Sequence, residues 1–545
     1  MTDYILSLIV FTPMAGALIV MLLPDRDRDM IRRVSLGIMI LELFFTIVLI
    51  LQFSIPGAES TYAESFQLVQ REKWIDLSLG RGQSFAIYYH LGVDGISLPL
   101  VVLSSIILLI GLISSWRIEK QSKGFFILYL ILASSIQGCF LALDFFLFYL
   151  FFELMLLPMF FLIGIWGGER RSYASIKFFI YTLVGSLLIL GVMIGLYLSV
   201  FDPNATQAGG LVRSFDLVLM TNFDNYLPES VFDPRSPSIY WGVPARFVAF
   251  LLLFVGFAIK LPAVPVHTWL PDAHVEAPTS ISVVLAALLL KVGGYGLIRI
   301  AYMVFPDAAI HYSYLVGFIG VLSILYGGLN AIAQRDFKRL IAYSSVSHMG
   351  FILVGLASLT HEGASGALFQ MVSHGLISAG LFLLVGVIYD RTQNRRIENF
   401  SGLASRLPGY TFVVVIMFFA SLGLPGLSGF VGELLVLMGA FGGTGLEYSH
   451  ITLWMAVLSV TGIILSAIYY LWTLQRMFFG QYFVRQASWE SHMKDLDARE
   501  WGMFVPLMLL IIILGIYPKV ILDFMDGSIT LFIKHVVNTG TALIR

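Results

Sequence analysis

The sequence predicts an all-α membrane protein with 14 transmembrane helices. Of its 545 residues, 58% are apolar and only 12% are charged, whereas a soluble domain averages about 45–50% apolar and about 25% charged residues. Apolar runs of about 20 residues, the length that crosses a bilayer, recur along the whole chain. The net charge is −1, so composition indicates no nucleic-acid partner and points instead to membrane lipids.

The apolar runs are separated by short polar or basic segments. A boundary between the fourth and fifth runs is marked only by Asp144. The predicted spans are 4–23, 34–54, 94–116, 124–143, 145–166, 174–200, 245–265, 278–303, 311–333, 339–358, 364–389, 410–440, 452–480 and 501–518.

The Lys and Arg residues of the loops predict the orientation. One set of alternating loops carries roughly twice as many of them as the other set, to which we assign Arg246 and Arg299. Since basic loops stay in the cytoplasm, both termini are predicted to lie on the outer, periplasmic side. The long loops 55–92 and 201–244 fall on that side. Loop 201–244 is rich in Asp, Asn, Pro and Ser, which predicts irregular structure.

The tail 520–545 is too polar to span the membrane. It is either an amphipathic helix along the outer surface or a frayed terminus. At the other end, the first run has no basic segment before it and no convincing cleavage site after it, so we interpret it as a retained helix.

The chain offers no site for a redox cofactor. Cys139 is its one cysteine, while iron–sulfur clusters and structural zinc sites need several thiolates. The glycine-rich dinucleotide and phosphate-loop motifs are absent from the sequence. We therefore predict no cofactor in this chain, and any redox chemistry coupled to it belongs to other subunits.

Four charged residues stand alone in long apolar runs: Glu153, Lys260, Lys291 and Glu433. A charge at membrane depth is costly and usually marks an ion or proton pathway. A buried Glu or Lys tends to lose its charge when alone and keep it when paired. A Glu–Lys pair that opens and closes therefore has a switchable proton affinity, although a static ion pair between helices is the simpler alternative.

Two histidines, His348 and His374, lie in adjacent apolar runs between a lysine and a glutamate. A single histidine there is usually structural, but two in sequence fit a proton relay. His267, Asp272 and His274 could suggest a metal site. They lie at a helix break among prolines, and we predict no metal there.

The segment 256–291 carries the most specific pattern in the chain. It contains Lys260-Leu-Pro, then His267-Thr-Trp-Leu-Pro-Asp-Ala-His274, then Glu276-Ala-Pro, and finally Lys291 within Leu-Leu-Leu-Lys-Val-Gly. This pattern resembles the signature of the antiporter-like proton-channel family, which includes membrane subunits of NADH:quinone oxidoreductase (respiratory complex I) and the large subunits of Mrp-type antiporters.

The resemblance, which extends over about 90–520, implies a specific organisation. Helices 4–8 and 9–13 would be inverted five-helix repeats with helices 7 and 12 broken, as the segments 261–265 and 423–429 suggest. The chain would divide into 1–123 (helices 1–3), 124–303 (first repeat), 311–482 (second repeat) and 500–545 (helix 14 and the tail).

The resemblance also implies roles for the isolated residues. Glu153 and Lys260 would be the input pair, Lys291 the connection, His348 and His374 the relay and Glu433 the exit. The implied function is proton translocation in the bacterial inner membrane, driven by NADH oxidation and quinone reduction in other complex I subunits, with sister antiporter-like subunits on both sides. A subunit of a Mrp-type cation/proton antiporter is the alternative.

Overall fold

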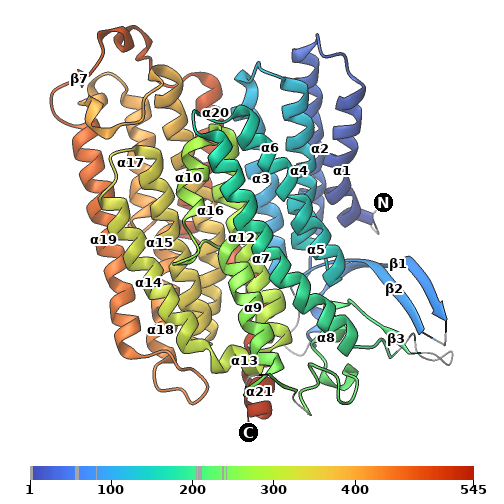
Figure 1. The fold of residues 1–545 in the computed structure, drawn as a ribbon. Coiled ribbons are helices and arrows are strands. Elements are labelled where there is room, and N and C mark those ends of the chain that lie inside the picture. The colour runs from blue at the N-terminus through green and yellow to red at the C-terminus, as the bar shows by residue number, and fades with distance from the viewer. Residues whose placement is uncertain are drawn as a thin grey trace.

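The computed structural model describes residues 4–55, 61–80, 83–203, 205, 211–235, 238–240 and 242–544. Its helices stand side by side in one bundle, with a small β-hairpin projecting near one end (Figure 1). Twelve helices in this part of the chain are long and apolar enough to cross a membrane. They correspond to twelve of the predicted runs, and the other two runs, 245–265 and 410–440, are the interrupted ones.

The first half of the bundle follows the predicted runs closely. Its membrane helices are α1 (Ile5–Leu22), α2 (Arg28–Gln52), α3 (Ser97–Ser114), α4 (Ser122–Leu141), α5 (Phe145–Leu154), α6 (Leu156–Trp166), α7 (Arg171–Ser199), α9 (Ala245–Lys260), α10 (Trp269–Glu276), α11 (Thr279–Val284) and α12 (Leu290–Gly296). The helices α5 and α6 form one span, 145–166, with a break at Met155.

The second half contains the longest helix and the C-terminal tail. Its helices are α13 (Pro306–His311), α14 (Ser313–Ile332), α15 (Phe337–Ala357), α16 (His361–Thr392), α17 (Pro408–Ser421), α18 (Ser428–Gly443), α19 (Leu453–Phe478), α20 (Ala498–Ile516) and α21 (Lys519–Ile544). Of the two alternatives for the tail, the helix is confirmed, because α21 packs along α13 and α16.

The predicted break in run 245–265 occurs directly after Lys260. The helix α9 ends there, and Pro262 and Pro265 follow in a turn that leads to α10. A proline supplies no N–H and clashes with the turn before it, so the helix cannot continue. Gly293 of α12 lies against this turn, and a Cβ on it would come within 2.6 Å of the Leu261 nitrogen. The close approach therefore requires glycine.

The second predicted break separates α17 from α18. Gly423 and Gly426 have φ angles of +80° and +94°, in the region that only glycine adopts without strain. Their conformation turns the chain between the two short helices, and it frees backbone groups at membrane depth. Such freed groups are tolerated where protein or a water-lined cavity surrounds them.

The span 279–302 has an irregularity that the sequence did not predict. Two π-helical segments, Leu285–Leu289 and Leu297–Tyr302, flank α12, which carries Lys291. The Lys291 ammonium donates a hydrogen bond to the Ala286 carbonyl five residues earlier, at 2.8 Å. Short π-helical turns inside helices occur often at functional sites.

The segment 55–92 was predicted only as a long loop, and its later part is instead a hairpin. The strands β1 (Gln67–Gly80) and β2 (Gln83–Val93) pair antiparallel, and β3 (Val212–Arg213) pairs parallel to β2. The short strands β4 (Ile239–Tyr240) and β5 (Val243–Pro244) pair with each other, as do β6 (Phe400–Ser401) and β7 (Phe483–Val484). Parts of loops 55–92 and 201–244 lie outside the described residues.

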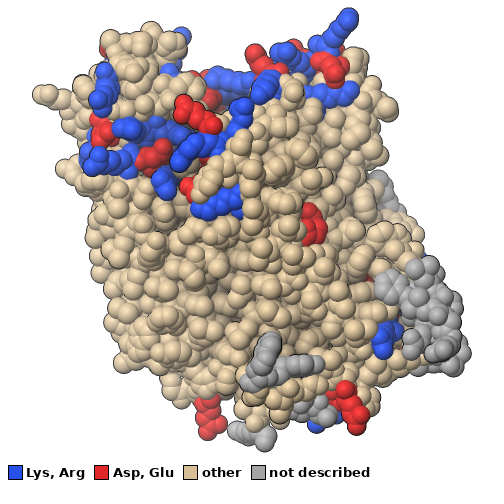
Figure 2. Space-filling model, viewed as in Figure 1, with Lys and Arg blue, Asp and Glu red and all other residues tan. Residues whose placement is uncertain are grey.

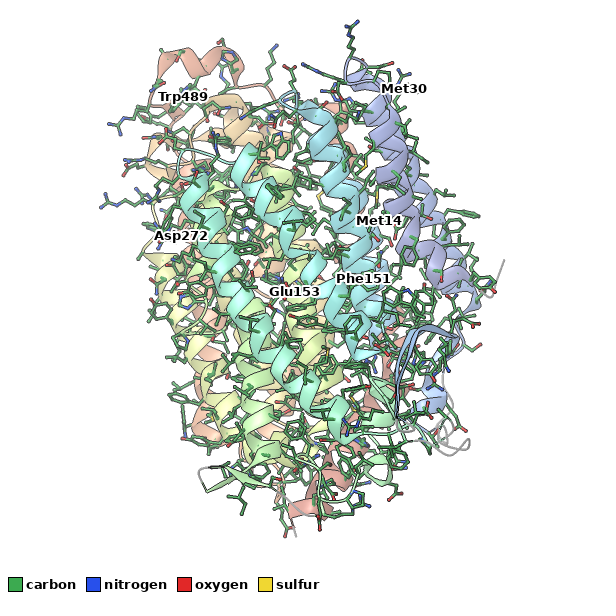
Figure 3. The ribbon with its side chains drawn as sticks, turned by 45° about the vertical axis from the view of Figure 1, so that its right-hand side comes forward. Met14, Met30, Phe151, Glu153, Asp272 and Trp489 are labelled. Carbon is green, nitrogen blue, oxygen red and sulfur yellow. The ribbon has the colours of Figure 1, made fainter. Side chains whose placement is uncertain are left out.

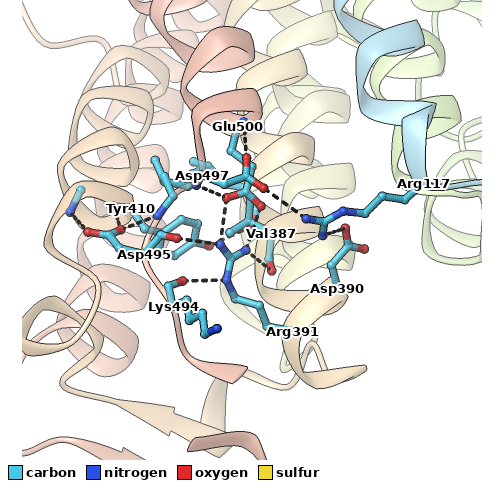
Figure 4. A network of polar contacts seen from close by, with 12 residues as sticks. Arg117, Val387, Asp390, Arg391, Tyr410, Lys494, Asp495, Asp497 and Glu500 are labelled. Atoms are coloured by element: carbon cyan, nitrogen blue, oxygen red, sulfur yellow. Dashed lines mark hydrogen bonds and ion pairs between the residues drawn. The ribbon is translucent and has the colours of Figure 1, made fainter. Parts of the chain in front are cut away.

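Charged side chains gather at the end of the bundle opposite the hairpin, above a belt without Lys or Arg (Figure 2). One network at that end joins α16 to α20 and to the chain before it (Figure 4): Arg391 bonds both carboxylate oxygens of Glu500 at 3.0 and 2.8 Å. Asp495 accepts hydrogen bonds from the Gly409 and Tyr410 amides. These contacts hold the ends of α16, α17 and α20 together.

The prediction that places Arg246 and Arg299 in outer loops is wrong. Arg246 and Arg299 are 2% and 1% exposed and lie in helical segments. Arg246 pairs with Asp307 at 2.8 Å, and Arg299 pairs with Asp94 at 2.6 Å. Without these two arginines, the outer loops carry even fewer Lys and Arg residues than the cytoplasmic loops. The predicted orientation is therefore unchanged.

Candidate functional site: a buried row of ionisable side chains

Four of the six predicted site residues form one continuous chain of contacts. The Lys291 Nζ lies 2.9 Å from His374 Nδ1. A hydrogen bond donated by Lys291 to Nδ1 requires the His374 tautomer that carries its proton on Nε2. Both side chains are buried, at 0% and 3% exposure. The contact joins α12 to α16.

The chain continues from one histidine to the next. The rings of His374 and His348 are 5.4 Å apart between centroids. His348 Nδ1 lies 3.3 Å from Glu433 Oε1, so α16, α15 and α18 each contribute one member. The other carboxylate oxygen of Glu433 is buried and has no protein partner. That oxygen faces the turn at Gly423, where an added Cβ would come within 2.6 Å of it.

Polar groups that the sequence did not single out surround His348. Ser421 Oγ lies 3.3 Å from its Nε2 and donates to the Tyr470 hydroxyl at 2.8 Å, which also contacts Ser344 at 2.7 Å. Gln370 Nε2 lies 3.4 Å from Nδ1. A serine or tyrosine in a membrane helix has no distinctive spacing, so only the fold reveals this support.

Lys260 lies apart from this chain. Its ammonium is 2% exposed and sits 4.7 Å from the centre of the Phe152 ring and 5.9 Å from that of Phe178. Aromatic faces stabilise a cation by about 0.5–2 kcal/mol. In the described part of the chain, no hydrogen bond or ion pair joins Lys260 to Lys291, although α9 and α12 pack together.

Glu153 and Lys260 lie on contacting helices, since Phe148 and Phe152 of α5 both pack on Phe257 of α9. The charge of Glu153 acts on Lys260, but among the described residues the two do not form a salt bridge. Glu153 is only half-buried, at mid-height of the bundle (Figure 3). One of its oxygens is enclosed and lacks a hydrogen-bond donor.

A polar cavity opens at the basic end of the bundle. Its volume is about 610 Å³, and Glu276, Lys338, Arg395 and Tyr389 are among the residues that line it. Lys338 is buried and donates to the Ala277 carbonyl at 2.6 Å. Farther inside, His274 is fully buried, neither of its ring nitrogens has a protein partner, and the charges of both Lys338 and Lys291 act on it.

A second group of ionisable residues lies outside the spanning helices, at the hairpin end. Asp144 caps α5 by accepting from the Leu147 amide at 3.1 Å, and burial raises the pKa of Asp144 to about 7. Asp216 lies 3.2 Å from His90 and 3.4 Å from Arg71. Burial works against ionisation of Asp216, but these two partners hold its pKa below the ordinary value.

One further isolated charge of an apolar run, Glu42, was not among the predicted site residues. Glu42 is the lone charged residue of run 34–54 and is fully buried in α2.

Asp272 is held by cations: Lys177 lies 2.7 Å away and Arg339 3.8 Å away. The Asp272 carboxylate therefore already has its counter-charges. That no metal binds there remains a prediction.

Comparison with known proteins identifies the family. The transmembrane family model "NADH:quinone oxidoreductase/Mrp antiporter" matches residues 142–466. The chain belongs to this family.

Full-length relatives narrow the comparison. Subunit M of NADH-quinone oxidoreductase from Rhodobacter capsulatus is 38% identical over 97% of this chain and 96% of its own length. Chain 4 of NADH-ubiquinone oxidoreductase from Arabidopsis thaliana is 35% identical over 97% of both. A chain of respiratory complex I from Thermus thermophilus has a TM-score of 0.78, with 30% identity over 98% of this chain and 100% of that one.

The Mrp complex from Dietzia sp. gives a TM-score of 0.76 at 18% identity. That likeness shows a shared fold and nothing finer. The architecture is thus that of a complex I antiporter-like subunit, with helices interrupted where the sequence predicted.

Proposed function

We propose that this chain is the subunit M-type, proton-translocating membrane subunit of a respiratory NADH:quinone oxidoreductase. The observation that carries the proposal is the buried contact chain Lys291–His374–His348–Glu433. A structural scaffold needs no ionisable row at membrane depth, where every such group is costly. A proton pathway needs groups that pass a proton between neighbours.

Each residue has a role in the proposed pathway. Glu153 and Lys260 form the input pair, whose separation is set by the coupled conformational change. Lys291 connects the two halves, His374 and His348 relay, and Glu433 releases the proton outward past Gly423. Moving one charge across 100 mV costs about 2.3 kcal/mol. One pKa unit is worth 1.36 kcal/mol, so a neighbouring charge that comes and goes can supply that work.

The cavity at the basic end supports a proton inlet. Water in it can reach Lys338 and Glu276, and the charges of Lys338 and Lys291 both act on His274. Two unpartnered ring nitrogens can accept and donate through water. We therefore propose that protons enter the contact chain Lys291–His374–His348–Glu433 from the basic end of the bundle.

Redox chemistry is assigned to other subunits of the complex, and this chain carries no cofactor of its own in the proposal. Cys139 is its one cysteine, and metal clusters need more thiolates. The Mrp-type alternative has only the likeness of fold behind it, at 18% identity, whereas the relatives at 38% and 35% identity carry names of NADH–quinone oxidoreductase subunits.

Sister antiporter-like subunits on both sides, with lipids around them, are the proposed partners. Glu153 supports this arrangement, because a half-exposed carboxylate at mid-height would be costly against lipid. A neighbouring subunit over α5 would enclose it. We also propose that the basic end faces the cytoplasm and that both termini lie on the periplasmic side of the inner membrane.

Copurification tests the assembly. A tag on this chain should recover NADH-oxidising and iron–sulfur subunits together, and the purified complex in liposomes should acidify one side when NADH and quinone are supplied. Recovery with only antiporter subunits, or a complex that oxidises NADH without moving protons, would overturn the proposal.

Cysteine labelling tests the orientation. The native Cys139 is buried, so background labelling should be low. Asp224→Cys, in an exposed loop at the hairpin end, should react with an impermeant maleimide from the periplasm, and Ser488→Cys, exposed at the basic end, should react only after the membrane is opened. The reverse pattern would invert the topology.

A further inference from the structure

Glu42 lies in a closed polar cluster that is separate from the Lys291–Glu433 row. It comes from α2, and its neighbours Ser105 and Gln137 come from α3 and α4. All three side chains are 0% exposed. The cluster therefore lies in the N-terminal helices, which the proposed pathway does not use.

The two carboxyl oxygens of Glu42 are unequal. Oε1 accepts from Ser105 Oγ at 2.7 Å and from Gln137 Nε2 at 2.6 Å. Oε2 is buried and has no partner. Glu500 shows the other pattern, with each oxygen bonded to one nitrogen of Arg391.

Asp94 also has its donors on one oxygen, Oδ1, and none on Oδ2, but one of those donors is the Arg299 guanidinium, which balances its charge. Both donors to Glu42 Oε1 are neutral, and this arrangement fits a neutral acid, whose carbonyl oxygen accepts.

The donors of the cluster already form hydrogen bonds that do not involve Oε2. Thr46 Oγ1 donates to the backbone carbonyl of Glu42 at 3.2 Å and lies 2.8 Å from Ser105 Oγ. Ser105 Oγ also accepts from Gln137 Nε2 at 2.8 Å. None of these donors can turn to Oε2 without losing a present bond. In the described residues, no Lys, Arg or His forms an ion pair with Glu42.

A buried carboxylate without a counter-charge is costly, so such a group binds either a proton or a metal ion. A metal ion needs several oxygen ligands around an open position. Here the Glu42, Ser105 and Gln137 atoms are already 2.6–2.8 Å from one another and bonded together. A proton on the carboxyl group needs neither several oxygen ligands nor an open position.

We propose that Glu42 is a proton-binding site, held as a neutral carboxylic acid in the resting protein and distinct from the pumping row. The donors of Ser105 and Gln137 fix its carbonyl oxygen, and the proton resides on Oε2. The site gives α2 a protonatable group of its own, held by side chains of α3 and α4.

Infrared difference spectroscopy of the intact complex tests this. The spectrum of the parent minus that of Glu42→Gln should contain the carbonyl stretch of a protonated carboxylic acid at neutral pH. The matched control Glu119→Gln, at an exposed position, should remove carboxylate bands only, because solvated Glu ionises near pH 4.3. Loss of carboxylate bands in Glu42→Gln would overturn the proposal, whether the charge is bare or held by a metal ion.

A second variant keeps the test usable if Glu42→Gln fails to assemble. Ser105→Ala removes one donor to Oε1 and leaves the acid in place. The protonated-acid carbonyl stretch should shift to higher frequency, since a less strongly bonded carbonyl is stiffer. An unchanged band in Ser105→Ala would contradict a neutral acid at Glu42. NADH oxidation by the complex should persist in both variants, which separates this result from any failure of the proposed pathway.

Discussion

The relay half and the input half of the site are built differently. In the relay half, Lys291, His374, His348 and Glu433 touch in sequence, all at 3% exposure or less. In the input half, Lys260 is surrounded by aromatic rings, Glu153 is half-buried, and the two do not pair. A chain of contacts transmits a proton, whereas a gap between opposite charges can open and close. Within the proposed pathway, this difference assigns conduction to the relay half and switching to the input half.

The largest expected effect is at the outer end of the relay half. Glu433→Gln keeps the shape and removes the titration, so most proton pumping per NADH oxidised should be lost. Pumping is measured as acidification by reconstituted complex, normalised to NADH oxidation. Glu433→Lys should retain part of it, because a lysine there can also bind and release a proton.

Glu447→Gln, at an exposed position near the same end, is the matched control and should pump like the parent. Parental pumping by Glu433→Gln would make Glu433 structural and move the exit elsewhere.

The next effect compares the two halves directly. Glu153→Ala and Lys260→Ala should each reduce pumping strongly while the complex still assembles. In double-mutant cycles on the pumping rate, groups in contact usually couple by about 0.5–3 kcal/mol. The Lys291–His374 pair should therefore couple more strongly than the Glu153–Lys260 pair. Stronger coupling at Glu153–Lys260 would mean that this pair closes during turnover.

The sequence predicted the relay half better than the input half. Isolated charges in apolar runs singled out four of the six residues, histidines in adjacent runs singled out the other two, and prolines or glycines predicted both helix breaks. The pairing of Lys291 with His374 could not be predicted, because it depends on the π-helical turns around α12. The hairpin was missed because 55–92 was interpreted only as a long connection between two apolar runs.

Burial misled the sequence interpretation in two other places. Arg246 and Arg299 stand near helix ends and resemble loop residues, yet Asp307 and Asp94, distant in sequence, hold them inside. Glu42 was visible in the sequence but has no basic partner to suggest a pair. The proposed inverted repeats and the division into 1–123, 124–303, 311–482 and 500–545 remain predictions.

A smaller effect is expected from the support around His348. Ser421→Ala removes the bridge from His348 Nε2 to Tyr470. Such a hydrogen bond contributes about 1 kcal/mol, so the pumping rate should fall a few fold and its pH profile should move, while assembly is kept. Ser459→Ala is the control, because Ser459 bonds only the Met455 carbonyl of its own helix. Equal effects from both variants would exclude a specific role for Ser421.

The smallest effect is at the outer end of the input half and changes stability, not pumping. Burial raises the pKa of Asp144 to about 7 from 3.8, so the folded protein binds a proton there more tightly than the unfolded chain does. Stability must then fall as pH rises from about 4 to about 7 and stay lowered above that. Asp144→Asn keeps the cap on α5, since Asn caps as well as Asp, and removes this dependence.

Hydrogen exchange of the first amides of α5 at pH 5 and pH 8 measures the contribution of Asp144. Protection, corrected for the intrinsic exchange rate, should decrease with pH in the parent and change less in Asp144→Asn. Asp224→Asn, at an exposed position, controls for a general loss of negative charge. If protection in the parent rises between these pH values, Asp144 is ionised in the folded protein. Asp144 would then be an anion at the outer end of the input half, held by its hydrogen bond from the Leu147 amide.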